Sequence, residues 1–384
     1  MIRIIANHFD HSVEMEFPEN ETVLFTKCME IHVADDFPPI VTAEEVLEPR
    51  ELSTLVNKEI NLDELNFLAK RLDSFTDKEM TQFFTAANYE SMSNLKDLIN
   101  LTFNLDKYTL ITDISNMADV GLEYTLNTSG CIDPKEIGSE RLVKIGYELL
   151  NSNKGVFTPY GLMFKSEKPM SEVYDGKVFP DYAYKDFILS VTISKNGKSE
   201  SLFLPENALA IRKAAARVGA PEIDSCEFNI ECENPNYVLL NDYFADVLKG
   251  EGIFELNKLL EVLDETQVDS KKLRAAIDLM NVSTANNIIT LAENLDDLEF
   301  IEDVSYGDYE AIGRFFVDTD CYEEYEISDD LQGFFNFAEF GEYIAEEKEG
   351  EFVPDGFMFY DGVGGIDDLR SQLESEESMT MGGM

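Results

Sequence analysis

The sequence predicts an α+β protein made of two tandem copies of one module, because matched segments recur in a fixed order. GVFTPYGLMF at 155–164 returns as GEFVPDGFMF at 350–359, with six of ten positions identical. Upstream, FPEN at 17–20 returns as LPEN at 204–207. Each copy also passes from a strand-like pattern to helical spacing and back to a mixed pattern, so the whole module is predicted to repeat.

Two further matches lie in the middle of each copy. ELNFLAKRLD, starting at Glu64, returns as ELNKLLEVLD, starting at Glu255. LINLTFNLD, ending at Asp106, returns as IITLAENLD, ending at Asp296. The offsets between matched segments run 187, 191, 190 and 195 residues along the chain. Small loop insertions produce a drift of this size without changing the order of elements.

The length of 384 residues also predicts more than one domain, since a domain usually holds ~100–200 residues. We predict a first module at 1–180, a second module at 181–362 and a mobile tail at 363–384. Each module would hold a small β-containing N-terminal part, a helical middle and a mixed α/β end, and the protein would be elongated. The tail is assigned because LRSQLESEESMTMGGM has few apolar residues and contains two consecutive glycines near its end.

The N-terminal part of each module is predicted to contain strands. MIRIIANHF leans toward β structure in the first copy, and FILSVTISK does so in the second. The second runs into Asn196-Gly197, a pair that favours a tight hairpin, so SESLFLPEN would return as the partner strand. A short helix, IRKAAARVGA, would follow and stop at Gly219 and Pro221.

The middle of each module is predicted to be helical. Asn61 can cap a helix, with Glu64 completing a capping box, and Thr76 with Glu79 offers a second box. The apolar residues of these helices recur at helical spacing and are predicted to be core. They are Leu62, Leu65, Leu68, Ala69 and Leu72 in the first helix, Leu95, Leu98 and Ile99 in the third, and Ala285, Ile288 and Ile289 in its match.

The end of each module is predicted to contain a short helix, at 141–150 and 331–345, followed by the repeated decamer. Gly161 and Gly356 follow a proline by two residues, which is typical of a turn before a strand. We therefore predict that the decamer forms a turn and a closing strand once per module.

Several functional classes are disfavoured by the sequence. Apolar runs fall short of the ~18–20 residues of a membrane span, and MIRIIANHFDH lacks the features of a signal peptide. The five cysteines are few, odd in number and scattered, as suits reduced thiols. These features predict a cytoplasmic protein.

No catalytic or metal-binding motif is recognised. His8 and His11 flank Asp10 but lack a third ligand, and DTDCYEEYEISD at 318–329 departs from a calcium loop at its turn and its last position. DGVGGIDDL at 361–369 lacks the spacing of a dinucleotide-binding motif. We therefore expect no enzymatic activity, no cofactor and no metal.

The charge of the chain is its most unusual property. Asp and Glu number 77 against 30 Lys and Arg, which gives −47. The segment 293–359 has a net charge of −20, whereas the matched segment 103–164 has −3. Because the two segments are predicted to share one fold, folding does not require these carboxylates. Duplex DNA carries a charge per ~1.7 Å, so −47 corresponds to ~24 base pairs or ~80 Å.

The acid-rich segment is accordingly the candidate binding surface, and its partner would be a basic protein rather than nucleic acid. The candidate residues are Glu293, Asp296, Asp297, Glu299, Glu302, Asp303, Asp308, Glu310, Asp318, Asp320, Glu323, Glu324, Glu326, Asp329, Asp330, Glu339, Glu342, Glu346, Glu347, Glu349 and Glu351.

Two parts of the sequence resemble the ArdA-type antirestriction proteins of Gram-positive mobile elements. NLDELNFLAKRLDSF and DLINLTFNLDKYTLI resemble their helical part, and LQGFFNFAEFGEYIA followed by GEFVPDGFMFYDG resembles their C-terminal part. The chain is about twice the usual length for this family, so it would be a tandem form. The resemblance implies an acidic DNA mimic that occupies the DNA groove of a type I restriction-modification enzyme, and it also implies a homodimer.

The sequence therefore predicts a non-enzymatic antirestriction protein that blocks a basic DNA-binding defence enzyme. The alternative is an acidic module that binds another basic DNA-binding protein without imitating DNA.

Overall fold

A computed structural model describes residues 1–152, 155–318, 325, 327–362, 367 and 369–373. These residues form a mixed α+β fold with several small sheets, as the sequence predicts at that level. The chain divides into two compact units. Unit 1 comprises Met1–Lys185, Ile193–Glu200 and Leu209–Cys226, and unit 2 comprises Asp186–Thr192, Ser201–Ala208 and Glu227–Met384.

The N-terminal sheet of unit 1 has the strand order β2-β1-β3-β4. Strands β1 and β2 are antiparallel, with Ile2 opposite Phe17. Buried residues alternate with half-buried ones in β1 and with exposed ones in β2. Asn20 then caps α1 by accepting a hydrogen bond from the Thr22 amide at 2.8 Å. The elements are β1 (Ile2–His8), β2 (His11–Phe17), α1 (Glu21–Glu30), β3 (Ile40–Glu48), η1 (Arg50–Leu55) and β4 (Glu59–Asn61).

The helical middle of unit 1 confirms the predicted caps at Asn61 and Thr76, but Asn61 and Glu64 do not form the predicted capping box. Asn61 caps α2, and Thr76 and Glu79 form the predicted capping box on α3. The Glu64 carboxylate accepts a hydrogen bond from the Tyr174 hydroxyl at 2.9 Å. All predicted apolar residues of these helices are buried. The elements are α2 (Leu62–Asp73), α3 (Asp77–Tyr89), α4 (Leu95–Thr102) and η2 (Leu105–Lys107).

The hairpin predicted at Asn196-Gly197 is confirmed, and both turn residues have positive φ angles, 51° and 79°. It belongs to a sheet of order β10-β8-β9. The predicted helix after it is also present as α7, which ends just before Gly219. The elements are β8 (Leu189–Lys195), β9 (Lys198–Leu204), α7 (Ala208–Val218), η4 (Ile223–Ser225) and β10 (Glu227–Glu231).

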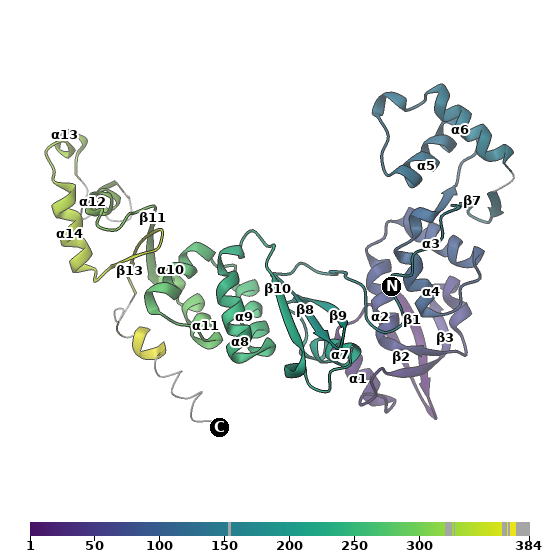
Figure 1. Cartoon of the computed structure of the whole chain (residues 1–384), viewed down its shortest axis with the longest axis horizontal. Helices are drawn as coiled ribbons and strands as arrows, with labels where there is room; N and C mark the ends of the chain where they lie inside the picture. Colours follow the sequence, from purple (N-terminus) through teal and green to yellow (C-terminus); the bar gives the residue numbers. More distant parts are fainter. Residues whose placement is uncertain (153–154, 319–324, 326, 363–366, 368, 374–384) are drawn as a thin grey trace. The chain divides into compact units, whose positions relative to one another are not determined.

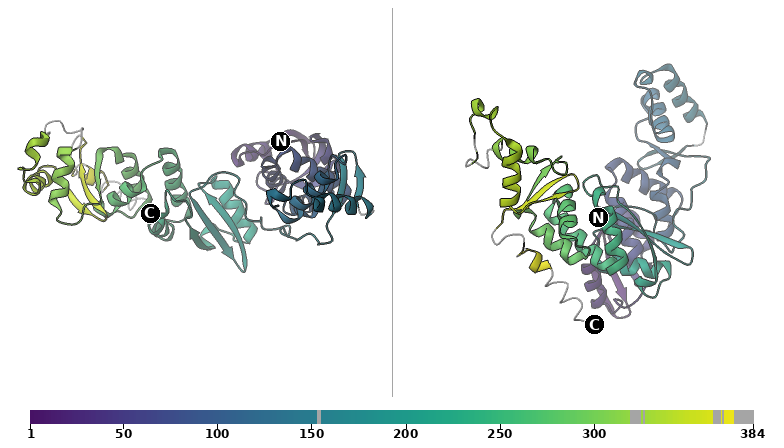
Figure 2. Two further views of the ribbon diagram at one scale, coloured as in Figure 1. Left: turned by 90° about the horizontal axis from the view of Figure 1, so that it is seen from above. Right: turned by 60° about the vertical axis from the view of Figure 1, so that its left-hand side comes forward.

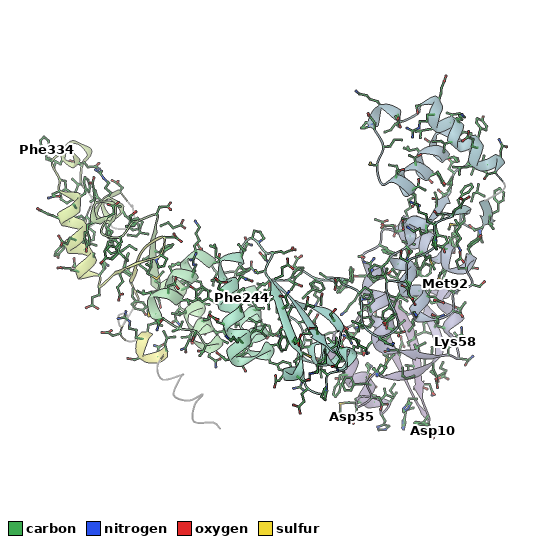
Figure 3. All side chains as sticks on the ribbon, viewed as in Figure 1. Asp10, Asp35, Lys58, Met92, Phe244 and Phe334 are labelled. Atoms are coloured by element: carbon green, nitrogen blue, oxygen red, sulfur yellow. The ribbon has the colours of Figure 1, made fainter. Side chains whose placement is uncertain are left out.

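A helical layer follows in unit 2, with the ring of Phe244 buried inside it (Figure 3). Ala285, Ile288 and Ile289 are buried in α11, as the sequence predicts. The elements are η5 (Val238–Leu240), α8 (Asn241–Glu251), α9 (Ile253–Thr266), α10 (Ser270–Met280), α11 (Ala285–Glu293) and η6 (Leu295–Asp297).

One side-chain contact has the same form in both helical layers. The Asn66 amide accepts a hydrogen bond from the Glu19 backbone amide at 2.9 Å and donates one to the Glu19 carbonyl at 3.0 Å. The Asn257 amide makes the same two bonds to Glu206, at 2.8 and 2.9 Å. In each case a helix is fixed to the Pro-Glu-Asn turn that follows a hairpin.

Each unit also contains a small sheet with a helix pair. Subdomain A (residues 108–165) has the strand order β5-β7-β6, and subdomain B (residues 298–360) has the order β11-β13-β12. The elements of subdomain A are β5 (Tyr108–Ile111), α5 (Met117–Ser129), η3 (Pro134–Glu136), α6 (Glu140–Asn151), β6 (Gly155–Thr158) and β7 (Gly161–Lys165). Those of subdomain B are β11 (Leu298–Glu302), α12 (Tyr309–Asp318), α13 (Asp329–Gln332), α14 (Phe337–Glu347), β12 (Glu351–Val353) and β13 (Gly356–Tyr360).

The repeated decamer forms a β-hairpin in both subdomains, so the predicted turn and closing strand are confirmed. The prediction of a single helix at 331–345 is wrong. The chain forms two helices there, α13 and α14, and the Asn336 side chain starts the second by accepting a hydrogen bond from the Glu339 amide.

The helices of each subdomain cross through glycines. A methyl group at Gly313 of α12 would lie 2.1 Å from the Phe337 carbonyl oxygen, and one at Gly341 of α14 would lie 1.8 Å from that of Tyr309. In subdomain A, Gly121 and Gly146 are equally close to backbone atoms, at 2.0 and 2.2 Å. The paired helices therefore lie with their backbones in contact, beside their own sheet (Figures 1 and 2).

The predicted tail lies mostly outside the described residues. Of those that are described, 369–373 are helical, and Leu369 and Leu373 are buried.

We expect Gly341→Ala to destabilise the protein by about 2–3 kcal/mol, because the added methyl group meets backbone that cannot rotate away. Gly250→Ala is the matched control: it lies near the end of α8 with open space around it, so it should stabilise by about 0.5–1 kcal/mol. Urea unfolding of both variants measures the difference. Equal stability of the two variants would show that the glycine crossing is not a packing constraint.

Candidate partner-binding surface

The predicted acidic residues lie on successive elements of unit 2, from the end of α11 to β12. Asp320, Glu323, Glu324 and Glu326 lie outside the described residues, and only the backbone is described at Asp329 and Asp330. Glu299 is half-buried. The other described candidates are exposed: Glu293, Asp296, Asp297, Glu302, Asp303, Asp308, Glu310, Asp318, Glu339, Glu342, Glu346, Glu347, Glu349 and Glu351.

Helix α14 carries the most regular part of this surface. Glu339, Glu342 and Glu346 are exposed, whereas Gly341 and Ile344 are buried toward α12 and the sheet. Residues three and four apart share one face of a helix and are separated by ~4.5–6 Å along its axis. The outer face of α14 therefore presents a row of carboxylates at short, even spacing.

Few cations neutralise this surface. Among the described residues, three of the candidate carboxylates have a basic nitrogen within 4.0 Å. Glu302 pairs with Lys271 at 2.9 Å, Glu310 with Arg314 at 2.8 Å, and Glu351 with Arg370 at 2.7 Å. All three pairs are exposed, and such pairs contribute ~0–1 kcal/mol. The other candidate carboxylates that are described as exposed face solvent, where a cationic partner can reach them.

The buried carboxylates of unit 1, unlike those of the acidic surface, are paired with cations of the chain. Lys213 of α7 donates hydrogen bonds to Glu21 at 2.7 Å and to Asp63 at 2.6 Å, and Arg217 donates to Glu200 through its Nε and Nη2 atoms. Burial lowers the pKa of Lys213, but Asp63 and Glu21 outweigh this effect, and the pKa is raised. These five charges are structural because each carboxylate has a buried cationic partner.

The outer face of α6 in subdomain A is a control for α14, since both helices cross a partner through glycine. We compare the positions two residues before the crossing glycine and one, two and five residues after it. On α6, around Gly146, these positions hold Lys144, Tyr147, Glu148 and Asn151. The α14 residues there are Glu339, Glu342, Tyr343 and Glu346. Of these exposed positions, α6 has one acid and one base, whereas α14 has three acids.

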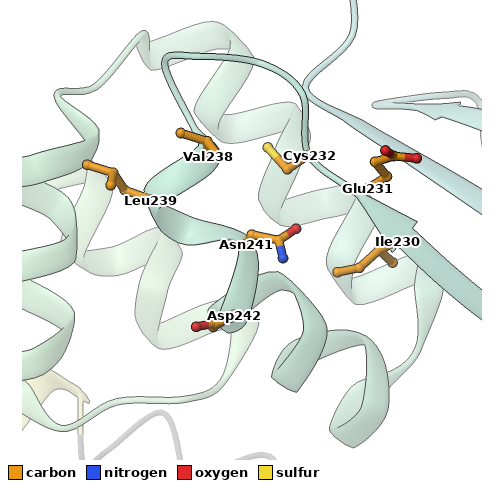
Figure 4. Close-up of a pocket in the computed structure, with 7 residues that line it drawn as sticks. All are labelled: Ile230, Glu231, Cys232, Val238, Leu239, Asn241 and Asp242. Atoms are coloured by element: carbon orange, nitrogen blue, oxygen red, sulfur yellow. The ribbon is translucent and has the colours of Figure 1, made fainter.

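A shallow hollow of about 380 Å³ lies between β10 and the start of α8 (Figure 4). Its lining includes the Cys232 thiol, whose pKa is raised by burial and whose Sγ lies 3.5 Å from the Ile188 carbonyl oxygen. A catalytic cysteine needs a lowered pKa and an adjacent base. The residues that line the hollow include no histidine, so no imidazole among them lies beside this thiol. The hollow therefore lacks the parts of a nucleophilic site.

The described residues contain no group of three metal-ligating side chains arranged to hold an ion. The His11 and His32 rings pack edge to face, 4.7 Å apart, and His8 contacts the Ile31 carbonyl oxygen. Most of the segment 318–329, which was compared with a calcium loop, lies outside the described residues. Within the described part of the chain, every helix is too short or too polar to cross a membrane.

Comparison with known proteins found no matching family model, no similar curated protein and no similar solved structure.

We expect the double variant Glu342→Gln/Glu346→Gln to stabilise α14 by about 0.5–1 kcal/mol at low salt. It removes a like-charge pair four residues apart and a negative charge from the helix C-terminus. Amide hydrogen exchange in α14 measures the change, which should shrink as salt rises.

The matched control on α6, Glu140→Gln/Glu148→Gln, should destabilise its helix, so that amide exchange in α6 becomes faster. Glu140 lies in the first turn, and Glu148 pairs with Lys144 at 3.7 Å. Faster exchange in the α14 variant would mean that the α14 carboxylates support the fold. Slower exchange in the control would mean that loss of a carboxylate stabilises either helix, whatever its position.

Proposed function

We propose that the chain consists of two copies of one module, the second of which carries the binding surface. Support comes from contacts that recur at matched positions. Asn66 and Asn257 make the same pair of bonds to the turn after a hairpin, 191 residues apart in the sequence. The sheets of subdomains A and B also have corresponding strand orders, and their helices cross through paired glycines.

We further propose that subdomain B imitates DNA and blocks the DNA-binding groove of a type I restriction-modification enzyme. The observation that carries this proposal is the difference between α6 and α14. The glycine crossing is the same, but the exposed face is nearly neutral on α6 and acidic on α14. Carboxylates that weaken a helix and have few internal cations are best explained by a cationic partner.

The electrostatics suit a groove that normally holds DNA. A protein that binds phosphates releases the counterions of DNA, and exposed carboxylates on α14 and on the η6–β11 segment would release counterions in the same way. The resemblance to the ArdA-type proteins adds the class of target. On this proposal the protein acts in the bacterial cytoplasm, where restriction enzymes meet incoming DNA, and it works by occupancy without catalysis, cofactor or metal.

The alternative function is an acidic module that binds another basic DNA-binding protein without imitating DNA. The concentration of charge favours it, because 293–359 carries −20 while 103–164 carries −3. A compact acidic patch suits a compact basic face, whereas an imitation of duplex DNA would be served by an extended track of charge.

Competition for DNA tests the proposal. A type I restriction-modification enzyme is bound to labelled duplex DNA, and the full-length protein is titrated in while DNA release is followed by fluorescence anisotropy. We expect release of DNA without cleavage or modification of either protein. The Glu342→Gln/Glu346→Gln variant should need about 3–10-fold more protein, and Glu140→Gln/Glu148→Gln should behave as the unaltered chain.

A stable ternary complex that retains DNA would refute mimicry and favour the alternative. Equal losses from the two double variants would show that the binding surface is not specific to subdomain B.

A further inference from the structure

The basic residues of subdomain B both lie against an aromatic ring and a carboxylate. The Arg314 guanidinium lies 4.2 Å from the centre of the Phe337 ring and donates hydrogen bonds to Glu310 at 2.8 and 3.1 Å. The Lys348 ammonium lies 5.8 Å from the centre of the Phe359 ring and donates to Asp361 at 2.8 Å. A ring face and a carboxylate together attract a cation more strongly than either does alone.

Other aromatic rings of subdomain B are exposed among carboxylates. Tyr343 is 57% exposed on the outer face of α14, one helical turn from Glu339 on one side and from Glu346 on the other. Its hydroxyl donates to Glu347, which raises the pKa of Tyr343. Because the outer face of α14 has no partner among the described elements, these groups are available together.

Tyr306 repeats this arrangement on the loop before α12. It is 91% exposed and lies between the exposed residues Asp303 and Asp308 in the sequence. Its ring packs against Phe352 with the centroids 5.1 Å apart, which limits how it can turn. Phe334, 90% exposed, lies at the outer end of the same subdomain (Figure 3). Aromatic side chains are enriched at protein interfaces, and three rings this exposed in one small subdomain indicate a contact surface.

The charge around the rings determines the kind of partner. Each carboxylate beside Tyr343 and Tyr306 repels another acidic protein, including a second copy of this chain at −47. A cationic side chain satisfies both the ring and the carboxylate. Arginine does so better than lysine, because its planar guanidinium stacks on a ring while its N–H groups bind a carboxylate in the same plane.

We propose that Tyr343 and Tyr306 hold arginine side chains of the partner, each guanidinium stacked on the ring and paired with a neighbouring carboxylate. The contact made by Arg314 within the chain is the template for this geometry. The proposal deepens the proposed function and rests on it only for the identity of the partner. Such arginine contacts would make the surface selective for grooves that bind DNA phosphates through arginine.

A first experiment requires no restriction enzyme. The full-length protein is titrated with nona-arginine and nona-lysine peptides of equal charge at one salt concentration. Bidentate pairing with carboxylates favours arginine to some extent by itself. Tyr306→Leu/Tyr343→Leu should therefore reduce the arginine preference about 5–20-fold without changing lysine binding to the same degree. Tyr306→Phe/Tyr343→Phe retains both rings and should keep the preference.

Both tyrosines are exposed, so the circular dichroism spectrum and the thermal unfolding of the leucine variant should be unchanged. These two measurements test directly whether the variant is folded. An arginine preference that survives in the leucine variant overturns the proposal. A preference lost equally in the leucine and phenylalanine variants also overturns it, because the hydroxyl and not the ring would then be responsible.

A second experiment separates this proposal from the proposed function. In the DNA displacement assay, the leucine variant should weaken displacement by a factor that stays the same as salt rises, since it removes no charge. An arginine preference that depends on the rings, in a protein that displaces no DNA, would uphold the arginine contacts and refute DNA mimicry. DNA displacement with no loss in the leucine variant would uphold mimicry and refute the arginine contacts.

Discussion

The crossing of α12 and α14 is the constraint on which the acidic surface depends. Gly313 and Gly341 bring the two helix backbones into direct contact, leaving no room for side chains between them. This contact fixes which residues of α14 face inward, so Phe337, Ile344 and Ala345 are buried and the opposite face points to solvent. Once that direction is set by backbone atoms, the outer residues can change without repacking the core.

The charges of the protein fall into two kinds that differ in burial and in partners. In unit 1, Lys213 and Arg217 neutralise carboxylates that are shielded from water, and removing one partner would leave an uncompensated buried charge. In subdomain B the carboxylates of α14 are exposed and repel one another along the helix. Repulsion of this kind is unfavourable for an isolated helix. We therefore propose that the acidic face serves binding, whereas the buried network serves stability.

Local patterns in the sequence predicted the elements that local chemistry determines. Asn196-Gly197 specifies its hairpin through positive φ angles, and Thr76 with Glu79 closes a capping box within one helical turn. Contacts between distant residues could not be predicted in this way. Lys213 meets Glu21 across 192 residues of sequence, and neither carries a motif. The helix predicted at 331–345 failed because apolar spacing continues through Asn336, which the structure uses as a cap.

The candidate surface was predictable in composition but not in detail. Counting charges located the excess in 293–359, because charge asymmetry requires no knowledge of the fold. The half-buried position of Glu299, the ion pairs of Glu302 and Glu310, and the exposure of Tyr306 depend on tertiary packing. The sequence did contain one signal that Tyr306 and Tyr343 could be contact residues: both lie among acidic residues in the segment with the charge excess.

We propose that the carboxylates of subdomain B occupy the positions of DNA phosphates on the target. The most direct measurement is a cryo-electron microscopy structure of the full-length protein bound to a type I restriction-modification enzyme, compared with the same enzyme bound to DNA. We expect Glu339, Glu342 and Glu346 to contact the basic side chains that contact phosphates in the DNA complex. A complex in which the outer face of α14 points to solvent, or in which the protein binds away from the DNA groove, would contradict the account.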